Sequence, residues 1–204
     1  MAAVFTLDLR KLAGYGIVVI LVGILVVQYV MAVAPSAQDD RTAACRALAP
    51  MPFNPAIGKL PAPAPDFEAA DYTGQTTSLR AYRGKVVFLN FWQTTCPPCK
   101  EEAPSMEGLA GLVDNPDFAM IAPASETSFE PVRRFFPKGT ALTVLLDPPD
   151  ESHSTGKIAR RYGTEKWPET YLIDRNGMVR YYFINSRRWD SGNAVDCVRS
   201  LLAE

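Results

Sequence analysis

The stretch Phe88-Leu-Asn-Phe-Trp-Gln-Thr-Thr-Cys96-Pro-Pro-Cys99-Lys-Glu-Glu102-Ala-Pro104 decides the fold of this chain. Residues Val86 to Phe91 are apolar apart from Asn90, which predicts a buried strand of the parallel type. The strand leads into a Cys-x-x-Cys motif that opens a helix. At a helix N-terminus the unpaired N–H groups and the macrodipole favour a thiolate, and a cysteine three residues further on lies one turn away. The stretch therefore predicts a dithiol that can close a disulfide.

A zinc site and a structural disulfide are the other roles open to this cysteine pair. Structural zinc needs four ligands, but beyond the pair the chain offers only Cys45, Cys197 and one histidine, His153, which are widely separated in the sequence. A structural disulfide across one helical turn closes too small a loop to stabilise a fold much. We therefore predict no metal site and favour a redox function.

Two groups of residues show a resemblance to known families. The first is similar to thioredoxin and comprises Phe91-Trp92, Cys96-Pro97-Pro98-Cys99-Lys100 and Pro104. The second resembles the membrane-tethered TlpA/ResA (CcmG-like) branch and comprises Gly84-Lys85-Val86-Val87, Asn90 and Glu102. The resemblance extends from about Asp66 to the C-terminus. It implies a thiol–disulfide oxidoreductase with a thioredoxin-like α/β fold, in which helices cover both faces of a mostly parallel sheet that ends in an antiparallel hairpin.

An apolar segment near the N-terminus predicts a membrane anchor. Residues 12–34 carry no charge and are long enough to cross a hydrocarbon core of about 30 Å. A cleaved signal peptide is the alternative, but its apolar core is usually shorter, and the pattern Ala32-Val33-Ala34 is followed by Pro35. Two basic residues in the segment 1–11 place it in the cytoplasm by the positive-inside rule, so everything after residue 35 is expected outside, in the periplasm or its equivalent. Four cysteines suit that oxidising compartment.

The rest of the chain divides into a spacer and one domain. Residues 35–65 contain seven prolines and predict a semi-rigid, extended spacer, although Cys45 within it suggests that part is tied down. Residues 66–204 predict alternating strands and helices. The expected strands are 67–70, 76–79, 86–92, 118–122, 142–146, 170–174 and 178–184, and the expected helices are 97–113, 129–136, 155–162 and 193–203. The net charge of −1 and the absence of a glycine-rich phosphate loop argue against nucleic-acid or nucleotide binding.

Cys96 is the predicted nucleophile and Cys99 the resolving thiol, because Cys96 precedes the helix and Cys99 lies in its first turn. Pro97 and Pro98 lack N–H groups, so two donors that would stabilise a Cys96 thiolate are missing. A less stabilised thiolate makes the reduced form a better electron donor.

Glu102 is the third predicted catalytic residue. It falls on one helical stripe with Cys99 and three apolar residues, Met106, Leu109 and Val113, so its carboxyl group is expected to be partly buried with a raised pKa. Such a group can act as acid or base for Cys99, and the resemblance implies an active-site glutamate at this position. The alternative is a kink at Pro104 that turns Glu102 into solvent.

The resemblance also implies a substrate groove. Pro168 matches the cis-proline that lies beside the dithiol in thioredoxin-like folds, and Trp167 and Glu169 flank it. Two residues depart from the thioredoxin pattern: Thr95 replaces the tryptophan before the first cysteine, and Asn90 replaces a buried aspartate. The loss of that aspartate leaves Glu102 as the candidate proton acceptor.

Cys45 and Cys197 form the remaining predicted pair. An oxidising compartment and an even cysteine count favour a disulfide between them. The alternative is that Cys197, on a helical face with Ala194 and Leu201, is an ordinary buried thiol.

These features favour a membrane-anchored reductant of protein disulfides in secreted or envelope proteins, for example of apocytochrome c during cytochrome c maturation. The family implies a transmembrane electron donor of the DsbD/CcdA kind, and no cofactor beyond the dithiol is expected. A disulfide oxidase or isomerase remains an alternative, as does a binding module that holds a partner or copper without catalysis. The peroxiredoxin pattern Pro-x-x-x-Thr-x-x-Cys is missing, which disfavours a peroxidase.

Overall fold

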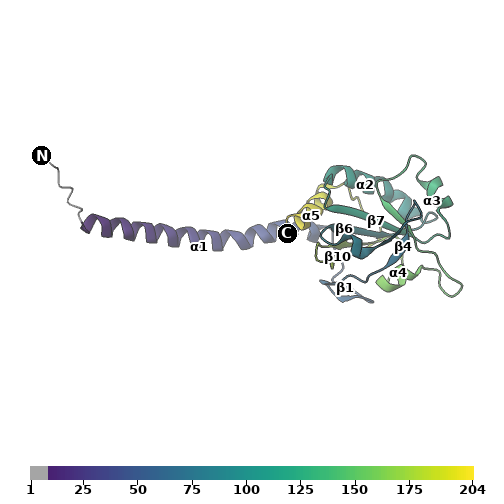
Figure 1. The fold of residues 1–204 in the computed structure, drawn as a ribbon, viewed down its shortest axis with the longest axis horizontal. Helices are drawn as coiled ribbons and strands as arrows, with labels where there is room; N and C mark the ends of the chain where they lie inside the picture. The colour runs from purple at the N-terminus through teal and green to yellow at the C-terminus, as the bar shows by residue number, and fades with distance from the viewer. Residues whose placement is uncertain (1–8) are drawn as a thin grey trace. The chain divides into compact units, whose positions relative to one another are not determined.

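The structure, a computed structural model, describes the backbone of residues 9–204 and the side chains of residues 15–32 and 42–204. The chain divides into two units, with the boundary between Arg41 and Thr42. The described part of the first unit is a helix. The second unit holds the central sheet (Figure 1). All the predicted site residues belong to it by residue number.

Helix α1 (Leu9–Ala47) contains the predicted anchor. Its segment Tyr15–Ala32 is long and apolar enough to cross a membrane, and its large apolar side chains are exposed. Exposed valine, isoleucine and leucine side chains along a whole helix are typical of a membrane span or a signal sequence. The helix does not end at Ala34, as predicted, but continues through Pro35 to Ala47.

A six-stranded sheet forms the centre of the second unit. Its strand order is β3 (Ala62–Pro63), β10 (Met178–Ile184), β9 (Glu169–Ile173), β6 (Val86–Phe91), β7 (Phe118–Ala124) and β8 (Thr143–Leu146). Strands β6, β7 and β8 are parallel, and β9, β10 and β3 add antiparallel pairs on the other side of β6. This is the predicted arrangement: the buried strand before the dithiol lies inside the sheet, between β9 and β7.

Helices cover both faces of the sheet. On one face pack α2 (Pro97–Val113), α3 (Phe129–Phe135) and α5 (Gly192–Leu202), and on the other α4 (Lys157–Tyr162) and the 3₁₀ helix η1 (Leu79–Tyr82) (Figure 1). The strands alternate between the two cores, as pleated strands must. In β6, Phe88 joins the α2 side, whereas Leu89 and Phe91 join the α4 side. Asn90 therefore faces α2.

The predicted elements from residue 66 onward are present, with ends within two residues of the expected ones. Strands β4 (Glu68–Ala70) and β5 (Thr76–Ser78) pair as a small hairpin, and a tight turn at Asn176-Gly177 joins β9 to β10. Gly177 has a φ of 74°, a left-handed conformation that favours glycine.

The predicted spacer differs from the structure. Residues 35–47 continue α1, and the segment after them is packed as part of the second unit instead of extending freely. Strands β1 (Phe53–Asn54) and β2 (Gly58–Lys59) form a small hairpin, and β3 pairs with the edge strand β10. Asn54 is completely buried and donates hydrogen bonds to the Tyr162 carbonyl and the Tyr171 hydroxyl, both 3.0 Å. Proline content alone does not reveal such contacts, since an edge strand accepts prolines.

Candidate active site

Cys96 and Cys99 form a disulfide at the N-terminus of α2. Cys96 is the N-cap residue and Cys99 lies in the first turn, as predicted. Cys96 is 7% exposed and Cys99 is 1% exposed. Cys96 is therefore the more accessible of the two residues, although both are buried in the oxidised state.

The start of α2 offers Cys96 one backbone donor. Pro97 and Pro98 occupy the first helical positions and carry no N–H group. The Cys99 N–H donates to the Cys96 sulfur at 3.2 Å. The helix N-terminus thus keeps part of its stabilising effect on a Cys96 thiolate, but only part.

The loop before Cys96 is held by hydrogen bonds to Glu126, which lies just after β7. Both the backbone N–H and the hydroxyl of Thr94 donate to the Glu126 carboxylate, at 2.8 and 2.6 Å. Gln93 donates to the Thr95 hydroxyl at 2.6 Å. These bonds fix the approach to the dithiol at the position where Thr95 replaces the usual tryptophan.

Glu102 is buried one turn after Cys99, with 1% of its surface exposed. Helix α2 runs unbroken through Pro104, so the alternative in which a kink turns Glu102 into solvent is excluded. Lys100 and Glu101 lie on the exposed face of α2. Burial raises the pKa of Glu102 from 4.5 to about 7, although hydrogen bonds from Trp189, the Arg187 N–H and Asn90 counteract this.

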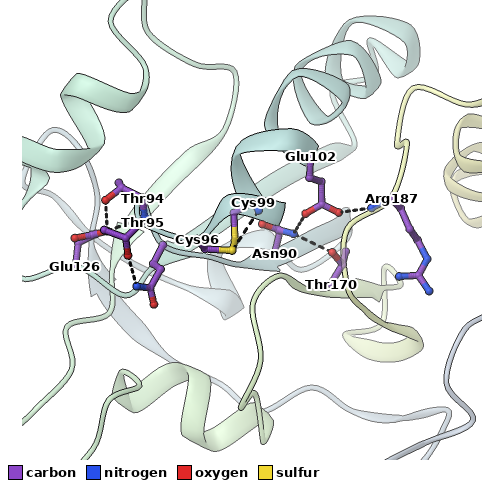
Figure 2. Close-up of a disulfide and its surroundings, with 10 residues drawn as sticks. Asn90, Thr94, Thr95, Cys96, Cys99, Glu102, Glu126, Thr170 and Arg187 are labelled. Atoms are coloured by element: carbon purple, nitrogen blue, oxygen red, sulfur yellow. Dashed lines mark hydrogen bonds between the residues drawn. A yellow bond between two sulfur atoms is a disulfide. The ribbon is translucent and has the colours of Figure 1, made fainter.

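Asn90 lies between the dithiol and Glu102 (Figure 2). Its amide nitrogen donates to Glu102 Oε2 at 3.2 Å and to the Thr170 hydroxyl at 2.9 Å. When Glu102 is ionised its carboxylate only accepts hydrogen bonds, which favours the amide orientation with the nitrogen toward Glu102. The Asn90 Oδ1 atom is buried and finds no hydrogen-bond partner among the residues that the structure describes.

Two residues that sequence reasoning missed hold the other oxygen of Glu102. The Trp189 indole N–H and the Arg187 backbone N–H, the latter at 3.1 Å, both donate to Oε1. Trp189 is completely buried and packs edge-on against Phe88 and Phe183. Both donors come from the loop between β10 and α5, where no periodic pattern marks them.

The Trp167–Pro168 peptide bond is cis, as the resemblance implies. Pro168 is buried at the start of β9, and Trp167 is half-buried against both cores. Thr170, two residues further on, contacts Asn90, so this end of β9 lies beside the Asn90–Glu102 pair.

The Glu169 side chain points into the core of the domain, whereas its role in a substrate groove stays a prediction. Its side chain is 2% exposed and lies on the α4 face of the sheet, opposite to Thr170. The Tyr182 hydroxyl donates to its carboxylate at 2.8 Å and the Tyr171 hydroxyl at 3.2 Å. Alternation along β9 explains the difference, because Thr170 faces α2 and its neighbours must face away. The Glu169 side chain therefore packs in the core on the face away from Thr170.

Cys45 and Cys197 form the second disulfide, with both side chains completely buried. It joins the last turns of α1 to α5 and closes a loop of 152 residues. The alternative of an unpaired buried Cys197 is excluded. His153 lies in an exposed loop and contacts Asp150 at 2.9 Å, away from the dithiol network.

The arrangement is suited to thiol–disulfide exchange. Cys96 is the more accessible of two disulfide-bonded cysteines, and a carboxyl group with a pKa near neutrality lies one helical turn after Cys99. A group of this pKa both accepts and donates protons at neutral pH.

Comparison with known proteins gives relatives and structural neighbours that are named for this chemistry. Residues 61–182 match the model of the AhpC/TSA family. The thiol-disulfide oxidoreductase ResA of Geobacillus thermodenitrificans is 35% identical over 118 residues, which cover 57% of this chain and 64% of the relative. The thioredoxin-like protein YneN of Bacillus subtilis is 35% identical over 120 residues, covering 57% of this chain and 66% of the relative. The chain thus spans slightly less than two thirds of the length of these relatives.

A crystal structure of a putative thiol:disulfide interchange protein DsbE from Chlorobium tepidum superposes with a TM-score of 0.58 at 30% identity, covering 69% of this chain and 94% of that chain. A putative protein disulfide isomerase from Bacteroides thetaiotaomicron superposes with a TM-score of 0.63 at 27% identity, covering 76% and 96%. The family match includes more than half of the 204 residues. The chain belongs to the AhpC/TSA family and carries its Cys96–Cys99 pair on a thioredoxin-like fold.

Proposed function

We propose that this protein is a thiol–disulfide oxidoreductase that reduces protein disulfides through Cys96 and Cys99. The observation that carries the proposal is the position of a buried carboxyl group, with a pKa raised to about 7, one helical turn beyond a dithiol. Relatives named as thiol-disulfide oxidoreductases support it.

The reaction has two exchange steps. In the first, the Cys96 thiolate attacks one sulfur of the substrate disulfide; a Cys96–substrate disulfide forms, the substrate S–S bond breaks, and the departing sulfur takes a proton. In the second, Cys99 attacks the Cys96 sulfur; the Cys96–Cys99 disulfide forms, the mixed disulfide breaks, and the departing substrate sulfur takes the second proton. The substrate gains two electrons and two protons, and the enzyme ends in the state that the structure shows.

Glu102 takes the proton of Cys99 in the second step. Neighbours at spacings of three on a helix lie side by side, so Cys99 and Glu102 are adjacent on α2. Near pH 7 about half of the Glu102 population is ionised and able to accept a proton. We infer that Asn90 assists: its buried Oδ1, which has no partner among the described side chains, is available to accept from the thiol of reduced Cys99.

The direction of the reaction follows from the weak stabilisation of the thiolate. A strong oxidant needs a thiolate held by several donors, whereas Cys96 receives a single backbone N–H and neighbours two prolines. A negative charge on Glu102 disfavours a thiolate further. Both effects favour the disulfide, and hence reduction of the substrate.

The site of action that we propose is extracytoplasmic. The apolar helix Tyr15–Ala32 would anchor the chain, with residues 1–11 in the cytoplasm and residues 66–204 outside. The buried Cys45–Cys197 disulfide suits an oxidising compartment. A transmembrane electron donor of the DsbD/CcdA kind would then return the dithiol to its reduced form.

Substrates of this enzyme would be disulfides in secreted or envelope proteins, with apocytochrome c as the first candidate. A direct test mixes the reduced full chain in detergent with a peptide that carries an oxidised Cys-x-x-Cys-His motif, the haem attachment motif. We expect one peptide disulfide to be reduced per chain, and none by the Cys96→Ser variant. If the reduced chain transfers no electrons while the oxidised chain oxidises the reduced peptide, the protein is an oxidase instead.

A further inference from the structure

Arg187 connects the C-terminal end of α1 to the loop that holds Glu102. Its guanidinium group donates to four backbone carbonyls, namely those of Ile184 (2.7 Å), Asn185 (2.9 Å), Leu48 (3.1 Å) and Ala49 (3.4 Å). It also lies over the Phe183 ring, 4.9 Å from the centroid. One side chain therefore joins two segments that are about 138 residues apart.

The same residue contacts the catalytic carboxyl group through its backbone. The Arg187 N–H donates to Glu102 Oε1 at 3.1 Å, and Trp189, two residues later, donates to the same oxygen. Ser105 adds a third link between α2 and this loop, because its hydroxyl donates to the Arg187 carbonyl at 3.1 Å and accepts from the Trp189 N–H at 3.1 Å. The loop backbone at Asn185 has a φ of 70°, an uncommon conformation that needs support from its surroundings.

Leu48 and Ala49 are held in place by the nearby Cys45–Cys197 disulfide. The Leu48 and Ala49 N–H groups bond back to the carbonyls of Cys45 and Arg46, so the chain turns directly after the disulfide. The adjacent Met51 pairs with Tyr182 of β10. The turn that follows α1 therefore holds the Leu48 and Ala49 carbonyls in place, and the guanidinium group of Arg187 donates to both.

From these contacts we infer that Arg187 is a positioning residue for Glu102, which uses the end of α1 as its support. It keeps the 185–189 loop closed over the carboxylate, so that two N–H donors stay aligned with Oε1. This inference rests on the proposed function for its relevance to catalysis. It adds that residues 42–49, which precede the thioredoxin-like sequence, belong to the machinery that sets the proton affinity of the site.

The groups that face Glu102 determine whether loss of the Arg187 side chain raises or lowers the pKa of Glu102. Asn90 from β6 and Trp189 from the loop are neutral donors, and Cys99 on α2 is held in the disulfide; Arg187 supplies the nearby positive charge. Each donor, and the charge of Arg187, lowers the pKa of Glu102. Loss of the Arg187 side chain removes the charge and loosens the donors, so the pKa of Glu102 should rise.

The test is a titration of the oxidised full chain in detergent micelles, followed by ¹³C NMR of glutamate side-chain carboxyl carbons. The Glu102 signal is the one that disappears in Glu102→Gln. We expect a midpoint near pH 7 for the wild type and a midpoint higher by at least about half a pH unit for Arg187→Met. The matched control is Arg188→Met, which removes an equal charge from an exposed arginine paired with Asp190, and its midpoint should equal that of the wild type.

The Arg187→Lys variant distinguishes the effect of the hydrogen bonds of Arg187 from the effect of its charge. It is also the variant to titrate if Arg187→Met does not fold. Lysine keeps the charge but cannot bond several carbonyls in a fixed fork, so its midpoint should lie between those of the wild type and Arg187→Met. An unchanged or lowered midpoint in the Arg187 variants, or an equal rise in Arg188→Met, would overturn the inference. Because the oxidised protein is titrated, the result does not depend on exchange activity and leaves the proposed function to its own test.

Discussion

The side-chain amide of Asn90 donates a hydrogen bond of 3.2 Å to Glu102, so that the strand before the dithiol and the helix after it meet at a carboxylate. Thioredoxin itself has an aspartate at the position of Asn90. In this chain the ionisable group is Glu102 of the helix, and Asn90 of the strand supplies an amide that orients it.

Replacing Cys99 with serine should trap substrates as mixed disulfides. The Cys96 thiolate still attacks a substrate disulfide, but no second thiol is present to release the product. Covalent adducts should be visible on a non-reducing gel and disappear on reduction. Cys96→Ser is the control, and adducts of equal abundance with that variant would show that Cys96 is not the nucleophile.

The stability of the oxidised protein should fall as pH rises from about 4.5 to 7. The pKa of Glu102 is about 7 in the folded state and close to 4.5 when unfolded, so in this range the folded state binds the extra proton. A shift of this size corresponds to about 3 kcal/mol of unfolding free energy, lost by pH 8 relative to pH 4.

The Glu102→Gln variant isolates this contribution, because other buried acids, such as Asp147, titrate equally in both proteins. Denaturant titrations at several pH values should show that the unfolding free energy of the variant minus that of the wild type increases from pH 4 to pH 8. The reason is that only the wild type loses the contribution of Glu102 as pH rises. A difference that stays constant between pH 4 and pH 8 would mean that Glu102 keeps an ordinary pKa.

In the reduced protein, Glu102→Gln should lower the apparent pKa values of the thiols and slow exchange. Removal of a negative charge near Cys99 favours the thiolates, while removal of the carboxyl group takes away the proton acceptor. The pH dependence of alkylation and the rate of peptide reduction measure the two effects. Since the three groups are coupled, the measured values belong to the set. Identical titrations in variant and wild type would contradict a catalytic role.

Loss of the Cys45–Cys197 disulfide should destabilise the protein but leave Cys96 and Cys99 able to form their disulfide. A loop of 152 residues between Cys45 and Cys197 corresponds to about 5 kcal/mol of unfolding free energy in the chain-entropy estimate, as an upper value. The double variant Cys45→Ser, Cys197→Ser should unfold at lower denaturant concentration and still form the Cys96–Cys99 disulfide. An unchanged midpoint would assign the bond no stabilising role.

The sequence predicted the parts of the site that depend on local patterns. The helical stripe that contains Cys99 and Glu102 placed the carboxyl group in the core, and the structure confirms this. The positions of Cys96 and Pro168 followed from motifs. In each of these cases a short stretch determines where the side chain points.

Contacts between distant segments were not predictable in the same way. Arg187 and Trp189 lie 85 and 87 residues after Glu102, in a loop without periodicity, so nothing local indicates that they bind it. Asn54 lies in a proline-rich segment, and its burial depends on partners more than 100 residues away. Glu169 could have been assigned to the opposite face from the alternation of β9, but only once Thr170 was known to face the dithiol.

The central claim is that Cys96 and Cys99 act as a reductant, and the reduction potential of this pair tests it most directly. The full chain is equilibrated in glutathione or dithiothreitol buffers of known potential, and the fraction of oxidised Cys96–Cys99 is measured by alkylation and mass spectrometry. We predict a potential nearer to that of thioredoxin, about −270 mV, than to that of strong oxidants, about −120 mV. A value above about −180 mV would contradict the account and identify the protein as an oxidase or isomerase.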